Sequence, residues 1–275
     1  MGRDVVLLTM PRPRLAGLRR LARSAAARRH EGVFIVEGAT LGAEAAAAGL
    51  RIREVYVETA RADEQVRRLG DELARAGADL VELEEGTLVR VGASVTPQPL
   101  LALAERPETA GPPALASFVL VAVSVADPGN AGTLLRCAEA AGADGVVFAG
   151  SGADPYGPKA VRASAGSIFR LPPALVDDPA VVLAGLHGRG LRTLGAAAGR
   201  GLPYDRADLR EPLALVVGSE SHGLPDSLSG CIDEWVHVPL GGQAESLNVG
   251  AAAAVLCFEV QRRRRHDPAG ADAAP

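Results

Sequence analysis

The chain contains 275 residues, and the 48% that are apolar suffice for one large or two modest domains with aliphatic cores. A net charge of −4 excludes a uniformly basic nucleic-acid-binding protein. Three cysteines without CxxC spacing, no recognisable signal peptide and no apolar run of roughly 18 residues predict a cytoplasmic protein without disulfides or membrane spans.

The first third of the chain predicts a small α/β unit. Charged or alanine-rich stretches typical of helices alternate with short apolar runs typical of strands. Helices are expected over residues 14–29, 40–50 and 61–76, and strands over 33–36, over 52–57 and at 80–81. The stretch 105–113 is rich in proline and charge, which predicts a linker.

The rest of the chain predicts a second, larger α/β unit. Its apolar strands alternate with helices, so we expect a parallel sheet that is covered on both faces. Strands are expected over 117–125, 145–148, 191–194, 213–217 and 235–238, and helices over 130–141, over 180–186 and from 247 onward. The tail 267–275 contains only Ala, Asp, Pro and Gly, which predicts disorder.

Polar and small residues follow three of these strands. The segments are SVADPGN at 124–130, GSESHG at 218–223 and VPLGG at 238–242. Ligands of open parallel sheets bind beyond the carboxyl ends of the strands, and small residues let the backbone approach them closely. We therefore expect the binding site at these three strand ends.

Several common sites are absent from the sequence. It contains no GxGxxG dinucleotide fingerprint and no GxxxxGK[ST] phosphate loop. Ser221 and His222 suggest a hydrolase, but the flanking glycines of a nucleophile elbow are missing, and neighbouring residues make a poor nucleophile–base pair. No His, Cys and Asp cluster has metal-ligand spacing, so no metal is predicted.

Three segments together resemble a known family. They are DPGNAGTLLRCAEAAGADGVVF, VVGSESHGL and VPLGGQAESLNVGAAAAVLCFE. In order and spacing they resemble the three motifs of SpoU/TrmH-type RNA ribose methyltransferases of the SPOUT superfamily. The segment KAVRASAGSIFRLP resembles the family's linking segment, and the first unit, with FIVEG, resembles the substrate-binding domain of its rRNA-modifying members. The resemblance covers roughly Arg19 to Arg264.

The resemblance implies a fold and a reaction. The fold is a C-terminal parallel-sheet SPOUT domain with a trefoil knot plus a smaller N-terminal α/β domain, and two knotted domains form a homodimer. The reaction transfers a methyl group from S-adenosylmethionine to a ribose 2′-hydroxyl of RNA. The corresponding boundaries are an RNA substrate-binding domain at 1–104, a linker at 105–115, the methyltransferase domain at 116–266 and the tail at 267–275.

The resemblance assigns catalytic roles to five residues. Arg136 stays protonated as a guanidinium, so we expect it to anchor phosphate and stabilise the developing alkoxide rather than act as a base. Asn130 is expected to orient the arginine or the RNA, and Glu220 to organise the site. Ser246 and Asn248 are expected to hold the ribose and the knot backbone. Helix capping remains the alternative for Asn130 and Ser246, and a structural pairing the alternative for Glu220.

The resemblance also implies binding residues. Gly218, Val238 and Leu247 fall where family members line the adenine pocket, and Leu240 is expected to neighbour them. An apolar core is the alternative for the three larger side chains. Gly250 departs from the family, which usually has serine there. This departure puts a hydrogen bond from that side chain in doubt, but not the cofactor pocket.

Two basic segments stand out in this acidic chain. Met1 to His30 contains eight arginines and one acid, and Arg262–Arg265 form a second cluster. The RNA-binding candidates are Arg19, Arg20, Arg28 and Arg29, and we expect the C-terminal cluster to add phosphate contacts. On charge alone, the alternative is that both basic segments are solvated helix ends without an RNA contact.

Three questions stay open at the level of the sequence. The N-terminal domain favours rRNA, most specifically 23S rRNA, over tRNA as the substrate. An enzyme that modifies an antibiotic-binding loop and one with a housekeeping role are not separated. A non-catalytic RNA-binding or ribosome-assembly factor is the alternative of another class, although all five residues of the family's catalytic set are present.

Overall fold

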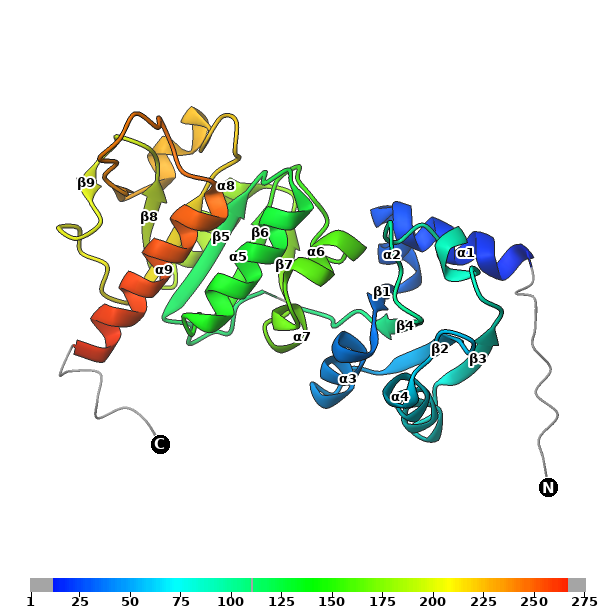
Figure 1. The fold of residues 1–275 in the computed structure, drawn as a ribbon. Helices are drawn as coiled ribbons and strands as arrows, with labels where there is room; N and C mark the ends of the chain where they lie inside the picture. Colours follow the sequence, from blue (N-terminus) through cyan, green and yellow to red (C-terminus); the bar gives the residue numbers. More distant parts are fainter. Residues whose placement is uncertain (1–11, 110, 267–275) are drawn as a thin grey trace, which may run out of the picture. The chain divides into compact units, whose positions relative to one another are not determined.

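The computed structural model describes residues 12–109 and 111–266, which form two compact units. The first unit comprises Met1–Glu108 and Tyr156–Phe169, and the second comprises Thr109–Pro155 and Arg170–Pro275. The predicted disorder of residues 267–275 lies outside the described residues. Each unit is considered by itself below (Figure 1).

The first unit contains a four-stranded sheet. Strand β4 pairs antiparallel with both of its neighbours, and β2 and β3 pair in parallel. The strands are β1 (Val33–Glu37), β4 (Leu100–Glu105), β2 (Ile52–Glu58) and β3 (Asp79–Leu83), in this spatial order. Its helices are α1 (Arg12–Arg23), α2 (Ala25–Glu31), α3 (Ala39–Ala47), α4 (Glu64–Arg75), the 3₁₀ helix η1 (Leu88–Arg90) and α6 (Pro158–Ala163).

Both faces of this sheet are covered. On one face, leucines 15, 18 and 21 of α1 pack in one apolar cluster with Leu88 and Val91 of the η1 segment and with strand side chains. Helices α3 and α4 cover the other face, where α4 packs on β2 and α3 on β4 (Figure 1). The leucine spacing of α1 is that of an amphipathic helix, which leaves Arg19, Arg20 and Arg23 exposed, whereas Arg14 is half-buried and reaches Glu54 of β2.

The segment Tyr156–Phe169 packs on β1 as part of the first unit, although it lies between two strands of the second unit in sequence. Phe34 packs edge-on against Tyr156 with ring centroids 5.1 Å apart. Arg162 pairs with the buried Glu37 at 3.1 Å, and Glu37 also accepts hydrogen bonds from Ser94 Oγ and the Gln98 N–H. The predicted methyltransferase range 116–266 includes this segment, and the domain boundaries stay a prediction.

The second unit contains a seven-stranded sheet, and every described strand pair in it is parallel. This arrangement confirms the predicted parallel α/β sheet. The trefoil knot stays a prediction. The strands, in spatial order, are β7 (Ala174–Val176), β6 (Gly145–Ala149), β5 (Phe118–Val123), β10 (Leu213–Val217), β8 (Arg192–Ala196), β11 (Glu234–His237) and β9 (Leu202–Pro203).

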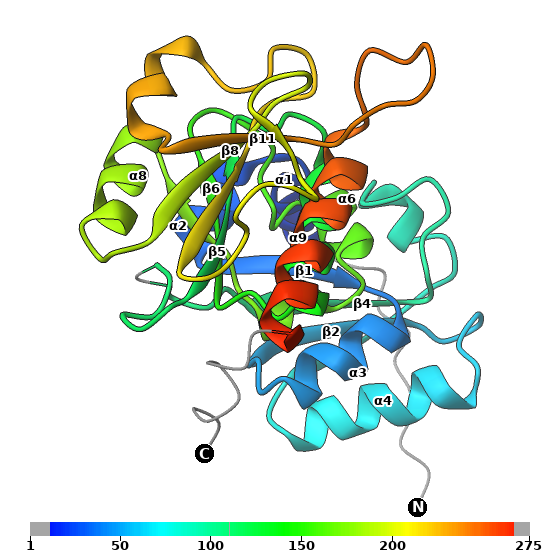
Figure 2. The same ribbon diagram turned by 90° about the vertical axis from the view of Figure 1, so that its left-hand side faces the viewer.

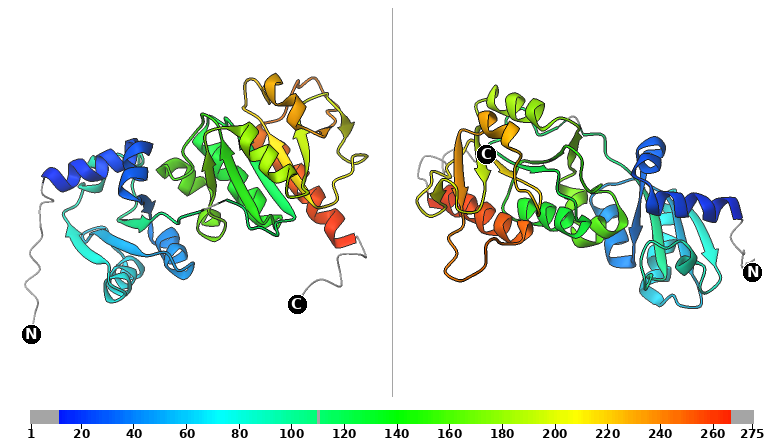
Figure 3. Two further views of the ribbon diagram at one scale, coloured as in Figure 1. Left: turned by 180° about the vertical axis from the view of Figure 1, so that it is seen from behind. Right: turned by 90° about the horizontal axis from the view of Figure 1, so that it is seen from above.

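Helices cover both faces of this sheet as well. Its helices are α5 (Pro128–Ala140), α8 (Pro179–His187), η2 (Asp226–Cys231) and α9 (Val249–His266). The short helix α7 (Ser167–Arg170) spans the boundary, since only its last residue belongs to the second unit. Leucines of α8 and η2 share one apolar cluster with valines of the sheet, and α8 lies across the sheet from α9 (Figure 2). Helices α5 and α9 lie side by side on the other face (Figure 3).

The structure differs from the expected elements at several places. The single helix expected over 14–29 is two helices, because Ser24 takes an extended conformation and caps α2 by accepting the Ala27 N–H at 3.1 Å. Strands β4, β7 and β9 and helices α6 and α7 were not predicted. Among the described helices, none combines the length and the apolar character that crossing a membrane requires.

The four arginines at the end of α9 are mostly engaged within the chain. Arg262 and Arg263 both pair with Glu259 at 2.7 Å, and Arg264 pairs with Glu211. These contacts hold the carboxyl end of α9 against the segment around Glu211. Three of the four side chains thus have an internal carboxylate partner, and the expected contact of this cluster with RNA phosphates stays a prediction.

Candidate active site

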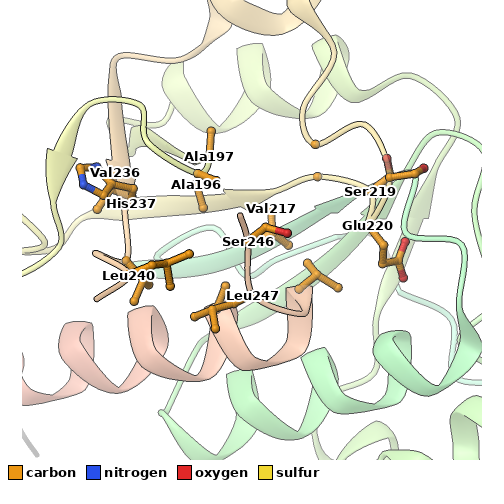
Figure 4. Close-up of a pocket in the computed structure, with 17 residues that line it drawn as sticks. Ala196, Ala197, Val217, Ser219, Glu220, Val236, His237, Leu240, Ser246 and Leu247 are labelled. Atoms are coloured by element: carbon orange, nitrogen blue, oxygen red, sulfur yellow. The ribbon is translucent and has the colours of Figure 1, made fainter. Parts of the chain in front are cut away.

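A cavity of about 250 Å³ lies at the carboxyl ends of β8, β10 and β11, where the second unit also places the start of α9 (Figure 4). All four predicted cofactor residues line it: Gly218, Val238, Leu240 and Leu247. Leu240 and Leu247 lie on the side of α9, and Glu220 lies at the opposite end of the cavity from His237 (Figure 4).

The lining of the cavity suits an adenosyl group. Aliphatic side chains and the backbone of Ala196–Ala198 and Gly218 surround most of the space, as a flat purine requires. Gly218 leaves no room for a side chain, because a Cβ there would stand 2.1 Å from the Gly223 carbonyl carbon. Serine hydroxyls and the Glu220 carboxylate supply polar groups at one end. The residues present therefore fit S-adenosylmethionine.

Glu220 collects hydrogen bonds from the loop that follows β5. Its carboxylate accepts the N–H groups of Ala126 and Asp127, each at 3.2 Å, and the Asn130 side-chain amide at 2.6 Å. Partial burial acts to raise the pKa of Glu220, but the hydrogen bonds from Asn130 and from backbone N–H groups outweigh it and lower the pKa below its ordinary value. Glu220 is therefore ionised, and its hydrogen bonds hold this loop in place.

Asn130 and Asn248 extend this network to the start of α9. The Asn248 side-chain amide donates to Asn130 Oδ1 at 3.0 Å, while Asn130 donates to Glu220. Asn248 Oδ1 also accepts the N–H groups of Gly250 and Ala251, so Asn248 caps α9. The cap of α5 is Asp127, not Asn130, because Asp127 Oδ1 accepts the Asn130 N–H at 3.0 Å.

The five predicted catalytic residues fall into two groups. Glu220, Asn130 and Asn248 form one hydrogen-bonded cluster, hereafter the carboxamide cluster, and Ser246 lines the cavity beside it. Arg136 is exposed on α5, does not line the cavity, and makes no hydrogen bond or ion pair with any described residue. Within one chain, Arg136 therefore makes no hydrogen bond or ion pair with the other four residues.

Ser221 and His222 lie on the turn next to Glu220. Ser221 Oγ is 2.7 Å from His222 Nδ1, and the His222 N–H donates to Ser219 Oγ. Both side chains are exposed, and no third side chain among the described residues orients the imidazole as a nucleophilic triad needs.

The four predicted RNA-binding arginines differ in their burial and in their internal partners. Arg28 is only 4% exposed and donates to the Leu21 carbonyl, so it is not available to a ligand. Arg20 pairs with Glu31. Arg19 and Arg29 are exposed and have no ion-pair partner among the described residues.

Sequence reasoning missed one wall of the cavity. Ala196 ends β8, Ala197 and Ala198 follow it, and Val236 and His237 end β11. A run of small residues directly after a predicted strand is a usable signal, because strand β8 ends at the same edge of the sheet as the other strands that carry the site.

The described residues also contain no group of three or more His, Cys, Asp or Glu side chains that could hold a metal ion.

A parallel α/β sheet with a cavity at its carboxyl edge, and a carboxylate and two carboxamides beside that cavity, is the arrangement that the resemblance to SPOUT methyltransferases predicts. Residues 117–258 match the SpoU rRNA methylase family, and residues 12–102 match the MRM3-like substrate-binding domain. The chain belongs to the SpoU rRNA methylase family, and it is an S-adenosylmethionine-dependent ribose 2′-O-methyltransferase.

Similar proteins support this assignment over most of the chain. The 23S rRNA (guanosine(2553)-2′-O)-methyltransferase RlmP of Bacillus subtilis is 36% identical over 234 residues, which cover 83% of this chain and 88% of RlmP. The AdoMet complex of the SpoU methyltransferase AviRb from Streptomyces viridochromogenes has a TM-score of 0.84 at 28% identity, covering 93% of this chain and 99% of AviRb. A solved RNA 2′-O ribose methyltransferase has a TM-score of 0.79 at 32% identity and covers 94% and 99% of the two chains.

Proposed function

We propose that this protein methylates a ribose 2′-hydroxyl of 23S rRNA. The observation that carries this proposal is the combination of a methyltransferase domain and a substrate-binding domain in one chain that matches the 23S rRNA enzyme RlmP along most of both sequences. Bacterial ribosomal RNA lies in the cytoplasm, so a protein with this substrate would act there.

The reaction needs the 2′-oxygen, the methyl carbon and the sulfur in line. Bound S-adenosylmethionine supplies an activated methyl group. Gly218, Val238, Leu240 and Leu247 would hold its adenosyl part in the cavity. Ser246 lines the cavity, and its hydroxyl would exchange a hydrogen bond with the target ribose.

The carboxamide cluster gives the reacting ribose a fixed surface. Glu220 stays ionised and holds Asn130, and Asn130 holds Asn248, so each amide has one orientation. Fixed dipoles at a developing alkoxide stabilise charge without reorganising during the reaction. A 2′-hydroxyl is a weak nucleophile, so a cation near its oxygen would contribute further.

Arg136 is the cation that the sequence assigns to this role, and it lies away from the cavity of its own chain. We infer that two chains form a homodimer through α5 and α9, and that Arg136 of each chain serves the cavity of the other. Large apolar side chains support this seam, because Leu247 is 39% exposed and Phe258 is 45% exposed. Ala251 is also exposed and lies seven residues before Phe258, on the same face of α9.

Label transfer from tritiated S-adenosylmethionine tests the proposed substrate. The purified protein is incubated separately with 23S rRNA, 16S rRNA and bulk tRNA, each isolated from cells that lack the enzyme. We expect label in 23S rRNA only, and its loss with Arg136→Ala. Label in tRNA would support a tRNA enzyme, and RNA binding without label would support a non-catalytic assembly factor.

A further inference from the structure

A group of arginines on the first unit remains available for a ligand. Most arginines of this unit have internal partners: Arg14 pairs with Glu54, Arg53 with Glu105, and Arg61 with Glu58. Arg19, Arg23 and Arg90 are exposed and make no hydrogen bond or ion pair with any described residue. The unit therefore neutralises much of its positive charge but leaves these three side chains unpaired.

These three arginines belong to neighbouring elements. Arg19 and Arg23 lie one turn apart on α1, which places their Cα atoms about 6 Å apart on one face of the helix. The Arg23 guanidinium reaches the turn after η1, where it lies 3.6 Å from the position that a Cβ on Gly92 would occupy. Arg90 ends η1 two residues earlier.

Helices α1 and η1 are held together by apolar side chains. Leu18 and Leu21 of α1 pack in the same apolar cluster as Leu88 and Val91, so the elements that carry the three arginines share one apolar core. The Leu88 N–H donates to Glu58 Oε1 at 2.6 Å, and Glu58 is fully buried. The backbone that carries Arg90 is thus fixed before any ligand binds.

We propose that Arg19, Arg23 and Arg90 form a phosphate-binding surface for the RNA substrate, hereafter the α1–η1 surface. This proposal rests on the proposed function and assigns the place where the first unit holds its substrate. The spacing of guanidinium groups one helical turn apart suits the successive phosphates of one RNA strand. It suits a single small anion less well. Such contacts position RNA without reading its sequence.

The surface differs from the one expected from the sequence. Arg20 and Arg28 were candidates but are engaged internally, whereas Arg23 and Arg90 were not candidates. Arg90 is far from the basic N-terminal segment in sequence, and only the packing of η1 against α1 brings it there.

A matched pair of variants tests this surface. The first replaces Arg19, Arg23 and Arg90 with glutamine. The control replaces Arg67, Arg68 and Arg75 with glutamine, which removes the same charge from α4 of the same unit. Binding of in vitro transcribed 23S rRNA is measured between 50 and 300 mM KCl, with the thermal unfolding of each variant as the folding check.

The α1–η1 variant should bind this RNA roughly tenfold or more weakly at low salt, and the slope of log K against log [salt] should fall by about 2 to 3. The control variant should keep the wild-type slope, and both should bind S-adenosylmethionine normally in calorimetry. Equal weakening by the two variants, or an unchanged slope in the first, overturns the surface but leaves the proposed function intact if the wild type methylates 23S rRNA. If the wild type neither binds nor methylates this RNA, both proposals fail.

Discussion

Asn248 donates a hydrogen bond from Nδ2 to Oδ1 of Asn130 at 3.0 Å and so joins two motifs that lie 118 positions apart in the sequence. The same Asn248 side chain uses its oxygen to cap α9. One carboxamide therefore fixes both the start of the C-terminal helix and the edge of the cavity, and its two atoms can be tested separately.

Asn248→Asp separates these two roles. The aspartate keeps an oxygen for the cap, so the melting temperature should change little. It loses the amide donor and places a carboxylate oxygen against Asn130 Oδ1, so methyl transfer should fall by about 100-fold through misplacement of the site. Asn248→Ala should lose activity and also about 1 kcal/mol of stability. Normal turnover by Asn248→Asp would show that the bond to Asn130 does not position the site.

Gly250 is needed because α5 and α9 approach closely there. A Cβ on Gly250 would stand 2.7 Å from Thr133 Cγ2 and 3.1 Å from Asn248 Oδ1. Gly250→Ala should destabilise the protein by about 1–3 kcal/mol, as overpacked sites do. Thr133→Ser removes the methyl group but keeps the hydroxyl that donates to the Gly129 carbonyl, so it should recover part of this loss. Chemical denaturation of the single and double variants measures the recovery, and strictly additive losses would contradict the contact.

The hydrogen bonds of the carboxamide cluster should weaken at low pH and should not change at high pH. The folded pKa of Glu220 is lower than its unfolded value, so its contribution to folding is complete above the unfolded value and is lost as pH falls through the folded one. Amide protection of Ala126 and Asp127 should therefore be constant from pH 8 to about 5 and should fall below about pH 4. Glu220→Gln should lack this transition. A loss of protection near pH 6.5 in the wild type would point to another group.

Glu259 should stabilise the end of α9. Its side chain is 8% exposed, and the hydrogen bonds from Arg262 and Arg263 lower its pKa to about 2. Glu259→Gln should cost about 1–3 kcal/mol at pH 7. The cost should persist down to about pH 5 and disappear as pH approaches 2, because the ion pairs are lost when the wild-type carboxyl is protonated. Glu85→Gln, at an exposed acid without an ion pair among the described residues, is the control and should cost almost nothing.

Mixed dimers test the shared site. Arg136→Ala and Glu220→Ala should each be inactive alone. If Arg136 serves the partner's cavity, a 1:1 mixture should recover about a quarter of the wild-type activity, because half of the dimers then hold one intact site out of two. If Arg136 acts within its own chain, every site in the mixture carries a lesion and no activity returns.

Much of this architecture could be predicted from local patterns. Strand β5 is a continuous apolar run because both faces of the sheet are covered, and the residues directly after β10 are small or polar because the cavity opens there. Strand β9 has only two residues, which is too short to leave a pattern. The break at Ser24 was missed because alanine and arginine, which favour helices, continue on both sides.

The position of individual arginines was harder to predict. Arg136 follows Asn130 by six residues, which turns it about 120° around α5 and away from the carboxamide cluster. The engagement of Arg262 and Arg263 could have been expected, since Glu259 stands three and four residues before them on one helix. The burial of Arg28 could not, because its acceptor, the Leu21 carbonyl, lies near the break between α1 and α2.

The chemical position of the transferred methyl group tests the central claim most directly. A methyl group on the 2′-oxygen blocks alkaline cleavage at that nucleotide, whereas a methyl group on a base does not. We predict that tritium from S-adenosylmethionine is recovered from alkali-treated 23S rRNA in one stable dinucleotide, and that Asn130→Ala abolishes this product. Label in mononucleotides, or no transfer by a protein that binds the donor, would contradict the account.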